Sequence, residues 1–320
     1  MATLTASAES VAASFPGYHS KENWAALLET NLDLVKQRMW NRQLVGLEVF
    51  NRNSTTKDHV INQYHYGVGL VPVSRSAGVL PVDQASLGHQ NTITMVQYRL
   101  AMLWEQEIIE DDQYEVVGPR QSKFLDAMNK TIEYLLSDVF NRGFGTSGAP
   151  ILCGDGMYLF DASRNKPHPG VAQWSNVETS AALTSNSLFT MEQNFSSNTD
   201  ERGHNAPLNL QEILIPKALE RTASDLAKSN MNPENALHQD NYYRGLTYRV
   251  WHYLTSATAW FGSACSPQDD DNELKFYWRI QPNTKTYDVG GNPDIVAQRV
   301  RARFGYGCDI PYTWRGNAGA

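Results

Sequence analysis

The stretch from residue 45 to residue 92 most strongly limits what this chain can fold into, because it holds little that could form a core. Short apolar segments at 47–50 and 68–71 alternate there with Gly, Ser, Asn and Thr, and no helical period holds. Glycine and proline interrupt the stretch at Gly67, Gly69, Pro72, Gly78, Pro81 and Gly88. The pattern predicts extended, hairpin-like segments. Such a long, thin segment is typical of a functional loop or of an arm that packs on a neighbour.

The segments on either side of this stretch have clearer patterns. Residues 1–19 are small and polar and predict a flexible arm, and a helix is predicted from Ser20 to about Leu44. From Thr92 to Trp104 the apolar residues alternate as in a strand, and the alternation stops at Glu110. The extended stretch therefore lies between a helix and a strand.

The longest helix signal in the chain begins at Gly118-Pro119 and ends near Gly143. Proline is tolerated in the first turn of a helix. Phe124, Met128, Leu135 and Val139 follow at helical spacing and form one apolar stripe. The helix is therefore expected to lie against other elements along one side.

The second half of the chain predicts a mixture of helices and strands. A turn-rich segment covers residues 145–180, and residues 241–262 are aromatic-rich and are predicted to be β structure. Helices are expected from Ser185 to about Asn194, and from Pro216 to before Asn232. Strands are expected at 210–215, 274–280 and 295–304. The fold class is therefore α+β.

The last of these strands carries the most informative charges. Arg299, Arg301 and Arg303 alternate with Val296, Gln298, Val300, Ala302 and Phe304, so the two sets face opposite ways. The arginine row is either a solvated strand face or an ion-paired sheet face or subunit seam. Glu105 and Glu107 have the same spacing on another predicted strand and are candidate partners, with cross-strand pairs contributing roughly 0.2–1 kcal/mol each. One sequence does not decide strand adjacency, so both interpretations stay open.

The candidates for catalysis or ligand binding are weak. Cys153 and His168 could be a nucleophile and its base, but no flanking signature or orienting group marks them. The cysteines at 153, 265 and 308 form no Cys-x-x-Cys pair, and Asp269-Asp270-Asp271 lacks the Gly and Glu of a calcium loop. Gly143-Phe144-Gly145 follows a helix, unlike a phosphate-binding loop. We therefore predict no catalytic, cofactor-binding or metal site and no enzyme activity.

Composition excludes several classes of protein. With 41% hydrophobic, 11% aromatic and 19% charged residues, the 320-residue chain is not a disordered protein. Three cysteines cannot build a disulfide scaffold, no apolar run would span a bilayer, and the N-terminus lacks signal-peptide features. The sequence thus predicts a protein made in a reducing cytoplasm, without a membrane partner. The net charge of −7 argues against a dedicated nucleic-acid binder.

The order of the elements and short motifs resembles a known family. The extended stretch, the acidic strand end, the long helix, the later Asp-Gly-x-x-Leu-Phe motif and a segment similar to the family's Leu-Ile-x-Pro-x-x-Leu-Glu occur in an order that resembles major capsid proteins of tailed phages. The segments that carry this resemblance are 105–112, 138–144, 155–160, His168, 174–176, 210–216, 219–226, 301–305 and 314–316. The resemblance is best over residues 95–320. It implies the HK97-type fold and a subunit that self-assembles into an icosahedral shell around double-stranded DNA.

The resemblance also implies a division of the chain. Residues 1–45 would be an N-terminal arm, and residues 46–95 an extended loop that reaches onto a neighbouring subunit. Residues 96–145 would form a peripheral domain with the long helix as its spine. Residues 146–273 would form an axial domain, and residues 274–320 would return to the peripheral domain as strands. An extended hairpin that cannot bury itself must bury against a partner, which agrees with this division.

The implied partners are further copies of the chain in hexamers and pentamers, a separate scaffolding protein, a portal and a cement protein. Packaged double-stranded DNA would be held by weak, non-specific contact. Assembly would take place in the host cytoplasm, and the final location would be the virion. Covalent cross-linking occurs in part of the family, but nothing marks Lys57 in the loop region as a cross-linking residue. We therefore expect no cross-link.

Two other functions compete with a shell protein. Ring contacts and a long hairpin would also suit a phage tail-tube or baseplate subunit, although such subunits rarely need a long helix followed by a mixed domain. A hydrolase that uses Cys153 and His168 is the third interpretation. Electron microscopy of purified particles separates the three, since they predict closed shells, tubes or rings, and small discrete particles.

Overall fold

The structure is a computed structural model. It describes residues 43–71, 73, 82–83, 87–105, 117–145, 148, 150–166, 172–231, 240–288 and 295–320. The predicted N-terminal arm, almost all of the helix predicted from Ser20, and residues Glu107 and His168 lie outside these ranges. Within them, no helix has both the length and the apolar character that a membrane crossing needs.

The chain divides into two units, each assembled from several segments. The first unit comprises residues 1–43, 97–131 and 280–303, and the second comprises residues 44–96, 132–279 and 304–320. Helix α5 (Val117–Asn141) and the strands β8 (Leu274–Asp288) and β9 (Ile295–Cys308) continue from one unit into the other. These long elements therefore join segments that lie far apart in the sequence.

Helix α5 confirms the strongest helix prediction, since its bounds differ by two residues at each end from the predicted 119–143. Its buried apolar residues lie three or four positions apart, with adjacent pairs at 124–125 and 139–140, as expected for one side of a helix. These residues are Phe124, Leu125, Met128, Ile132, Leu136, Val139 and Phe140.

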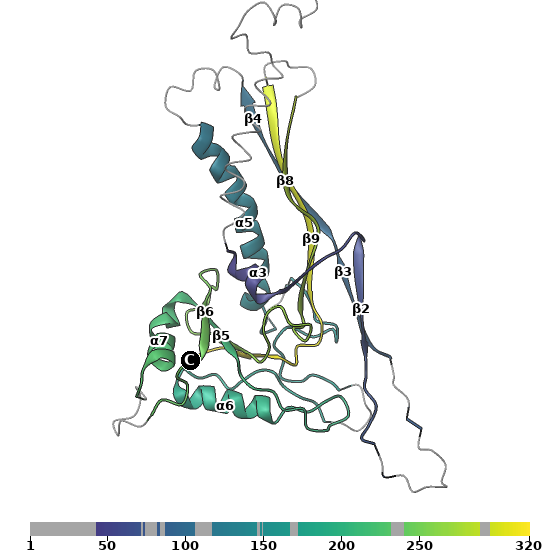
Figure 1. Cartoon of the computed structure of the whole chain (residues 1–320), viewed down its shortest axis with the longest axis vertical. Helices are drawn as coiled ribbons and strands as arrows, with labels where there is room; N and C mark the ends of the chain where they lie inside the picture. The colour runs from purple at the N-terminus through teal and green to yellow at the C-terminus, as the bar shows by residue number, and fades with distance from the viewer. Residues whose placement is uncertain are drawn as a thin grey trace, which may run out of the picture. The chain divides into compact units, whose positions relative to one another are not determined.

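A four-stranded sheet has the order β1-β8-β9-β4, with β1 at Asn51–Ser54 and β4 at Val96–Glu105. Strand β1 pairs parallel with β8, so that Asn51 lies opposite Lys275. Figure 1 shows β8 and β9 running side by side as the longest strands. Strands from the beginning and the end of the chain thus share one sheet.

The two faces predicted for β9 are confirmed. Burial alternates along the strand: Arg299, Arg301 and Arg303 are partly exposed, whereas the residues between them are buried. Those buried neighbours are Gln298, Val300, Ala302 and Phe304. A strand with side chains alternating in this way has one face in a core and one face available to something else.

A second sheet, within the second unit, has the order β10-β7-β5-β6. Its strands are Trp314–Asn317, Trp260–Ser263, Glu212–Ile215 and Thr247–Val250, respectively. The helices α6 (Ser185–Ser196) and α7 (Glu220–Lys228) contribute to the same core. The residues of this core include Leu188, Met191, Phe195, Ile213, Ile215, Leu226 and Trp260.

Helix α6 begins where its sequence provides a reciprocal cap. Thr184 accepts a hydrogen bond from the backbone N–H of Ser187, and the Ser187 hydroxyl accepts one from the backbone N–H of Thr184. These two bonds satisfy donors that a helix start otherwise leaves free. The helix predicted from Ser185 is therefore confirmed. The strand predicted at 210–215 is also confirmed, but it is shorter and covers only β5, Glu212–Ile215.

An aromatic cluster surrounds the C-terminal half of α5 in the second unit. The Phe140 ring is fully buried, and its centroid lies 5.1 Å from that of Phe261 and 5.4 Å from that of Trp314, in edge-on geometry. Phe50 and Trp251 contact the same ring at 6.4 and 5.7 Å. Edge-on packing of this kind adds roughly 0.5–1.5 kcal/mol per pair beyond the burial of area.

The structure corrects the prediction at the start of the extended stretch. Residues Val45–Val49 form a short helix, α3, and not an extended segment. The carboxylate of Glu133 accepts a hydrogen bond from the backbone N–H of Gly46 at 3.3 Å, and a Cβ at Gly46 would lie 3.0 Å from Leu136. The contacts of α3 with α5 therefore determine its helical conformation. The sequence of the five residues of α3 alone does not reveal these contacts.

Three strands also differ from the prediction. The strand predicted from Thr92 is two strands, β3 (Leu87–Thr94) and β4, with a break at Met95. The buried Met95 donates its backbone N–H to the carbonyl of Asp58 at 2.9 Å, which interrupts the strand pattern. Strand β8 extends beyond the predicted 274–280, and β10 was not predicted as a strand. The aromatic-rich residues 241–262 hold only the short strands β6 and β7.

Candidate functional site at the base of the hairpin

The extended stretch forms a hairpin of two antiparallel strands, as its sequence predicts. Strand β2 (His59–His65) pairs with β3, with Val60 opposite Ile93 and a register shift between Gln63 and His65 (Figure 1). Exposed and partly buried residues alternate along β2. Ile93 is 3% exposed, and a Cβ at Gly307 would lie 2.7 Å from its side chain, so the base of the hairpin packs against the end of β9.

The part of the hairpin beyond its base exposes apolar side chains. Val71 is 93% exposed and Val73 is 95% exposed, which leaves almost no apolar area buried within the chain. Neighbouring residues with the same property are Val68, Leu70, Val82 and Leu87. A group of exposed apolar side chains on one segment typically marks an interaction surface.

An ion pair connects the hairpin to the turn that follows α6. The guanidinium of Arg202 lies 2.8 Å from the Asp83 carboxylate, and its Nε donates to the carbonyl of Gly67 at 3.1 Å. Asp83 also accepts the backbone N–H of Gly69 at 2.7 Å. A second connection runs from the Tyr64 hydroxyl, which donates to Glu201 at 2.5 Å. The outgoing and returning parts of the hairpin are thus connected to one turn.

Hydrogen bonds that do not involve the hairpin hold this turn in place. Asp200 accepts hydrogen bonds from the backbone N–H groups of Arg202 and His204 at 2.9 and 2.8 Å. Partial burial favours a raised pKa of Asp200, but these backbone hydrogen bonds outweigh it and lower that pKa. The ammonium of Lys166 donates to the carbonyls of Thr199 and Asp200, each at 2.8 Å. Arg202 is therefore presented from a rigid turn.

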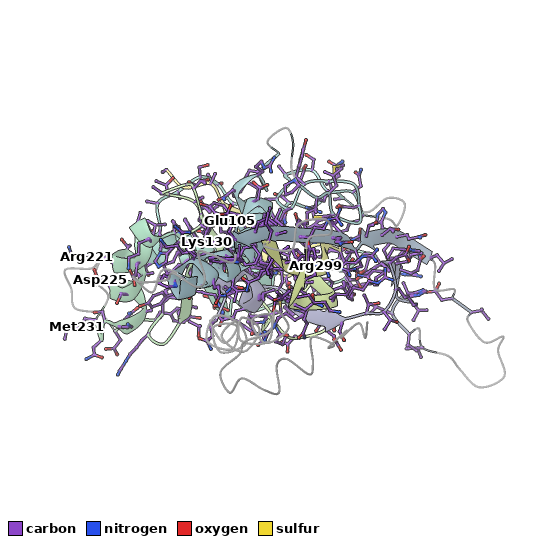
Figure 2. The ribbon with its side chains drawn as sticks, turned by 90° about the horizontal axis from the view of Figure 1, so that it is seen from above. Glu105, Lys130, Arg221, Asp225, Met231 and Arg299 are labelled. Carbon is purple, nitrogen blue, oxygen red and sulfur yellow. The ribbon has the colours of Figure 1, made fainter. Side chains whose placement is uncertain are left out.

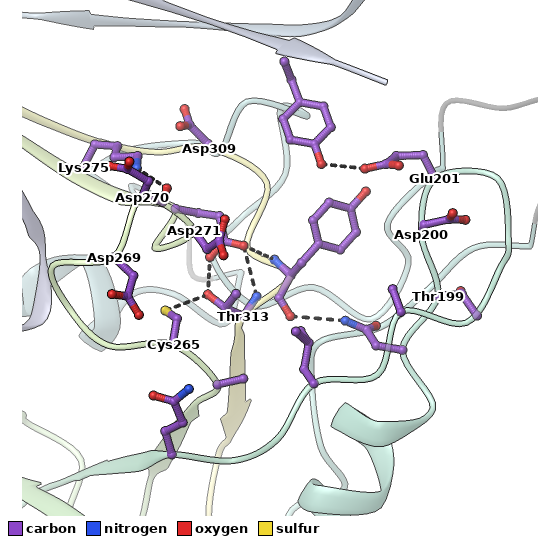
Figure 3. Close-up of a pocket in the computed structure, with 18 residues that line it drawn as sticks. Thr199, Asp200, Glu201, Cys265, Asp269, Asp270, Asp271, Lys275, Asp309 and Thr313 are labelled. Atoms are coloured by element: carbon purple, nitrogen blue, oxygen red, sulfur yellow. Dashed lines mark hydrogen bonds between the residues drawn. The ribbon is translucent and has the colours of Figure 1, made fainter. Parts of the chain in front are cut away.

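An acidic cavity of about 520 Å³ lies beside the base of the hairpin, and Figure 3 shows its lining. Tyr64 reaches it from β2, and Lys275 is the basic side chain among the lining residues, with its ammonium donating to the carbonyl of Asp270 at 2.7 Å. The lining carboxylates are Asp200, Glu201, Asp269, Asp270, Asp271, Glu273 and Asp309. The cavity therefore has a strongly negative lining.

Glu273 is the most perturbed acid in this lining. Burial raises the pKa of its carboxyl group to about 7, although hydrogen bonds from Thr313 and Tyr312 act in the opposite direction. Oε1 accepts the backbone N–H groups of Tyr312 and Thr313, each at 3.1 Å, and Oε2 accepts the Thr313 hydroxyl. This site can therefore bind or release a proton near neutral pH.

The arrangement of acids does not make a metal site. Across the ranges that the structure describes, no three His, Cys, Asp or Glu side chains are grouped to hold a metal ion. In the predicted acidic loop, Asp269 accepts the backbone N–H of Ser266 at 3.1 Å and so closes its own turn. Its backbone carbonyl accepts the Asn51 amide at 2.6 Å. The Asp269 carboxylate thus stabilises the backbone of its own loop.

Cys153 lies in a buried turn, beside a buried ion pair. Arg164 is fully buried and its Nη1 lies 2.6 Å from the Asp155 carboxylate, while its Nη2 lies 3.8 Å from the Cys153 thiol. His168, the predicted partner of Cys153, falls outside the described residues, so their pairing stays a prediction. The neighbours of the thiol that the structure does describe are those of a structural residue.

Strand β9, which carries the arginine row, and strand β4, which carries Glu105, are neighbours, as an ion-paired sheet face requires. Strands β4 and β9 are hydrogen-bonded neighbours, and Trp104 Nε1 donates to Gln298 Oε1 at 2.9 Å across them. Because these two share the buried face, the residues next to them, Glu105 and Arg299, belong to the other face.

No ion pair joins Glu105 to the arginine row within the described residues, and the two labelled side chains lie apart in Figure 2. The Nε atoms of Arg299 and Arg301 are buried without a hydrogen-bond partner there. The strand adjacency is thus confirmed. Glu107 lies outside the described residues, so the ion-paired sheet face and the subunit seam both stay predictions.

Sequence reasoning missed the residues that tether the hairpin. Asp83 and Arg202 lie 119 residues apart, Tyr64 and Glu201 lie 137 residues apart, and no motif marks them. The available signal was weak: a row of charged residues, Asp200-Glu201-Arg202, follows a predicted helix in a segment with turn residues. Arg164, the most buried cation of the site, was missed for the same reason.

Comparison with known proteins gives one family and one fold. A family model described as a phage capsid protein matches residues 90–318. A search of curated proteins finds no match.

Solved structures resemble the chain over most of its length at low sequence identity. The capsid of a native GTA particle is 12% identical, with 87% of this chain and 91% of that chain covered, at a TM-score of 0.56. A chain of Mycobacterium phage Adephagia is 12% identical, with 98% of both chains covered, at a TM-score of 0.50. The decorated capsid of bacteriophage JBD30 is 13% identical, with 67% of this chain and 92% of that chain covered, also at 0.50.

Proposed function

Because the chain belongs to the family of phage capsid proteins, we propose that its hairpin is the loop by which one subunit of the shell reaches onto the next. The chain is a major capsid protein of a tailed phage with the HK97-type fold, and its function is self-assembly into the head shell. What supports the role of the hairpin is its row of apolar side chains, which the subunit itself leaves exposed by 58–95%.

The proposal extends to the division of the chain. Residues 46–95 act as the extended loop and 1–45 as the N-terminal arm. Residues 96–145, with α5 as the spine, and 274–320 form the peripheral domain. Residues 146–273 form the axial domain, which crowds around the fivefold and sixfold axes. The order of elements supports this division, because the long helix and the returning strands β8 and β9 flank the segment that contains α6 and α7.

The proposed partners are hexamers and pentamers of the chain, a scaffolding protein, a portal and a cement protein. Assembly takes place in the host cytoplasm. The net charge of −7 supports weak contact with the packaged DNA, because a subunit with this charge does not neutralise many phosphates. The subunit works through many weak contacts and carries out no catalysis. The family match supports neither the tail or baseplate subunit nor the Cys/His hydrolase.

Deletion of the hairpin tests its role directly. Removal of residues 60–88 with a short Gly-Ser bridge is expected to leave a soluble subunit that forms no stable shells, because the exposed apolar residues that bind the neighbour are gone. Negative-stain electron microscopy and sedimentation measure the shells. Circular dichroism of the deletion variant reports whether the remaining subunit is folded. Normal shells from a folded deletion variant would contradict the proposed role.

A milder change separates the tether from the loop itself. Arg202→Ala removes the ion pair with Asp83 and the bond to Gly67 but keeps every apolar residue of the hairpin. The conservative Arg202→Lys is its matched control. Slower assembly of Arg202→Ala, with shells of normal shape, is expected if the tether only positions the hairpin before contact.

Covalent cross-links between subunits are not expected. Lys57 is exposed, and its backbone N–H donates to the Thr55 hydroxyl at 3.2 Å, but no sequence feature marks it as a cross-linking residue. Mature shells boiled in detergent should therefore run as monomer on a denaturing gel. A ladder of higher species would overturn this expectation, and the variant Lys57→Arg would show whether Lys57 forms the bond.

A further inference from the structure

Strand β4 forms one edge of its four-stranded sheet, and the side of β4 away from β9 pairs with no other strand among the described residues. This free edge is long, since β4 has ten residues, and the strand contains neither proline nor lysine. Soluble proteins usually protect an edge strand with such residues or keep it short, because its free N–H and C=O groups can pair with another chain. The free edge of β4 is therefore available to a further strand.

Apolar side chains of β4 are exposed on both faces of the sheet. Trp104 is 2% exposed and marks the face that packs in the core, and Leu100 lies on this same face but is 51% exposed. Leu103 lies on the opposite face and is 62% exposed. A partner strand on the free edge would cover part of both leucines, which a sheet that ends at β4 leaves in contact with water.

The charges of β4 are complementary to those of a second, antiparallel copy of the same strand. Arg99 and Glu105 are the charged residues of β4; both are exposed, and both lie on the face opposite Trp104. Neither side chain makes an ion pair within the ranges that the structure describes. Met102 lies midway between them in the sequence (99 plus 3, and 105 minus 3). If two copies of β4 pair about Met102, Arg99 of each copy lies opposite Glu105 of the other.

Only one register of such a pair satisfies both the charges and the faces. A slip of one residue would place the core faces of the two sheets on opposite sides, because alternate side chains point to opposite faces. If the pair is centred on residue 101 instead, Leu103 lies opposite Arg99 and both charges lose their partners. With Met102 at the centre, Leu103 lies opposite Ala101 on the same face as the charge pairs. The sequence of β4 therefore specifies its own partner and register.

We propose that the β4 strands of two copies of the chain pair antiparallel across a two-fold axis at Met102. The pair joins two four-stranded sheets into one continuous sheet, by the same backbone hydrogen bonds with which a peptide adds a strand to a sheet edge. The overlap from residue 99 to residue 105 is about 24 Å long, at roughly 3.4 Å per residue. Backbone pairing supplies the attraction, and the two charge pairs fix the register.

This contact differs in symmetry from the contacts within a ring. A ring of subunits is built from heterologous contacts, in which two different surfaces meet, whereas the β4 pair is isologous because both copies contribute the same residues. The pair would therefore connect subunits of neighbouring rings of the shell. The inference rests on self-assembly of the chain, but not on the role proposed for the hairpin, which contributes no residue to the free edge of β4.

A thiol at the centre of the pair tests the register. In Met102→Cys shells the two introduced thiols would face each other, with about 4.5–5.5 Å between Cα atoms, a distance that a disulfide can span. Shells treated with diamide and denatured without reductant should yield dimers and no larger species, above the background of treated wild-type shells. Leu100→Cys is the matched control, since its two copies would lie about 14 Å apart, too far for a disulfide. A dimer from Leu100→Cys would overturn the proposal. No dimer from Met102→Cys would also overturn it, because another segment would then cover the edge.

An exchange of charges tests the same edge without a new thiol. Arg99→Glu alone and Glu105→Arg alone each place like charges opposite each other, so each should lower the yield of shells several-fold at low salt, where charges are least screened. The double variant Arg99→Glu with Glu105→Arg restores opposite charges and should recover the wild-type yield. Circular dichroism checks that the unassembled subunits are folded. Wild-type yields from both single variants, or no recovery in a folded double variant, would overturn the pairing. Absence of shells from the wild type would instead contradict self-assembly itself.

Discussion

Arg164 takes a full positive charge into the interior, and its partners explain why the structure tolerates it. Beyond Asp155, its Nε donates to Asn176 at 3.2 Å and its Nη2 to the carbonyl of Leu159 at 2.9 Å. A buried guanidinium is costly unless each donor finds an acceptor. Here the acceptors come from residues 155–159 and from Asn176, so Arg164 orders the irregular segment that sequence patterns describe only as turn-rich.

Glu273 makes stability depend on pH. The folded pKa of about 7 exceeds the ordinary value of 4.5, so the folded state holds the proton more tightly. Its contribution is constant below about pH 4.5 and is lost as the pH rises to about 7, by about 3 kcal/mol at most. In Glu273→Gln the amide keeps one oxygen for the two backbone donors, and this pH dependence should disappear.

The measurement is the free energy of unfolding of the unassembled subunit at pH 4.5 and at pH 8, for wild type and Glu273→Gln. The wild type should lose more stability over this interval than the variant, and the difference isolates Glu273 from the other acids. Parallel pH curves for the two proteins would show that Glu273 does not hold its proton in the folded state. Asp270→Asn, at the exposed side of the same cavity, is the matched control.

At the scale of elements, the sequence pattern predicts the long helices and strands. The conformation of short elements depends on contacts with neighbouring elements. Helix α5 has 25 residues with one apolar stripe, so its own period identifies it. Helix α3 has five residues and depends on Glu133 and Leu136 of α5. Strand β10 is fully buried and pairs with β7, so its form depends on a strand about fifty residues earlier.

The aromatic cluster around α5 gives a prediction at this scale. Phe140→Ala should destabilise the subunit by about 3–5 kcal/mol, because the ring is fully buried among five aromatic neighbours that cannot close the cavity. Chemical denaturation measures the loss. Phe189→Ala on α6 is the control, since that ring is 48% exposed and should cost less than about 1 kcal/mol. Equal losses for the two variants would contradict the central position of Phe140.

At the scale of the whole molecule, some apolar side chains and hydrogen-bond donors of the described residues have no partner among those residues. The hairpin exposes apolar residues, and the Nε atoms of Arg299 and Arg301 have no hydrogen-bond partner among the described residues. Heterologous contacts around a ring can complete such surfaces in a closed assembly. Both features are therefore expected at contacts between subunits of the shell.

Charge reversal tests the arginine row at this scale. The triple variant Arg299→Glu, Arg301→Glu and Arg303→Glu should remain folded but fail to assemble, because a subunit seam with acidic partners would become repulsive. The matched triple Lys variant keeps the charge and should form shells. Electron microscopy and circular dichroism measure assembly and folding, respectively. Normal shells from the Glu variant would show that the row is only a solvated face.

The candidate site was less predictable than the fold, for a physical reason. The hairpin itself follows from glycine spacing and the lack of a core, which are local properties. Its tether joins Asp83 to Arg202, and a backbone hydrogen bond beneath its base joins Gly154 to Cys308, so both depend on contacts between distant segments.

The sequence by itself determined the long helix, the alternating faces of β9, the coreless hairpin and, through the order of its motifs, the family. These are properties of periodicity and order along one chain, and burial of one face is enough to enforce them. Only the tertiary structure decided which charges meet: Arg202 with Asp83, Arg164 with Asp155, and Glu273 with the backbone of residues 312–313. Such pairs act over a few ångströms in space, and distance along the sequence does not report that separation.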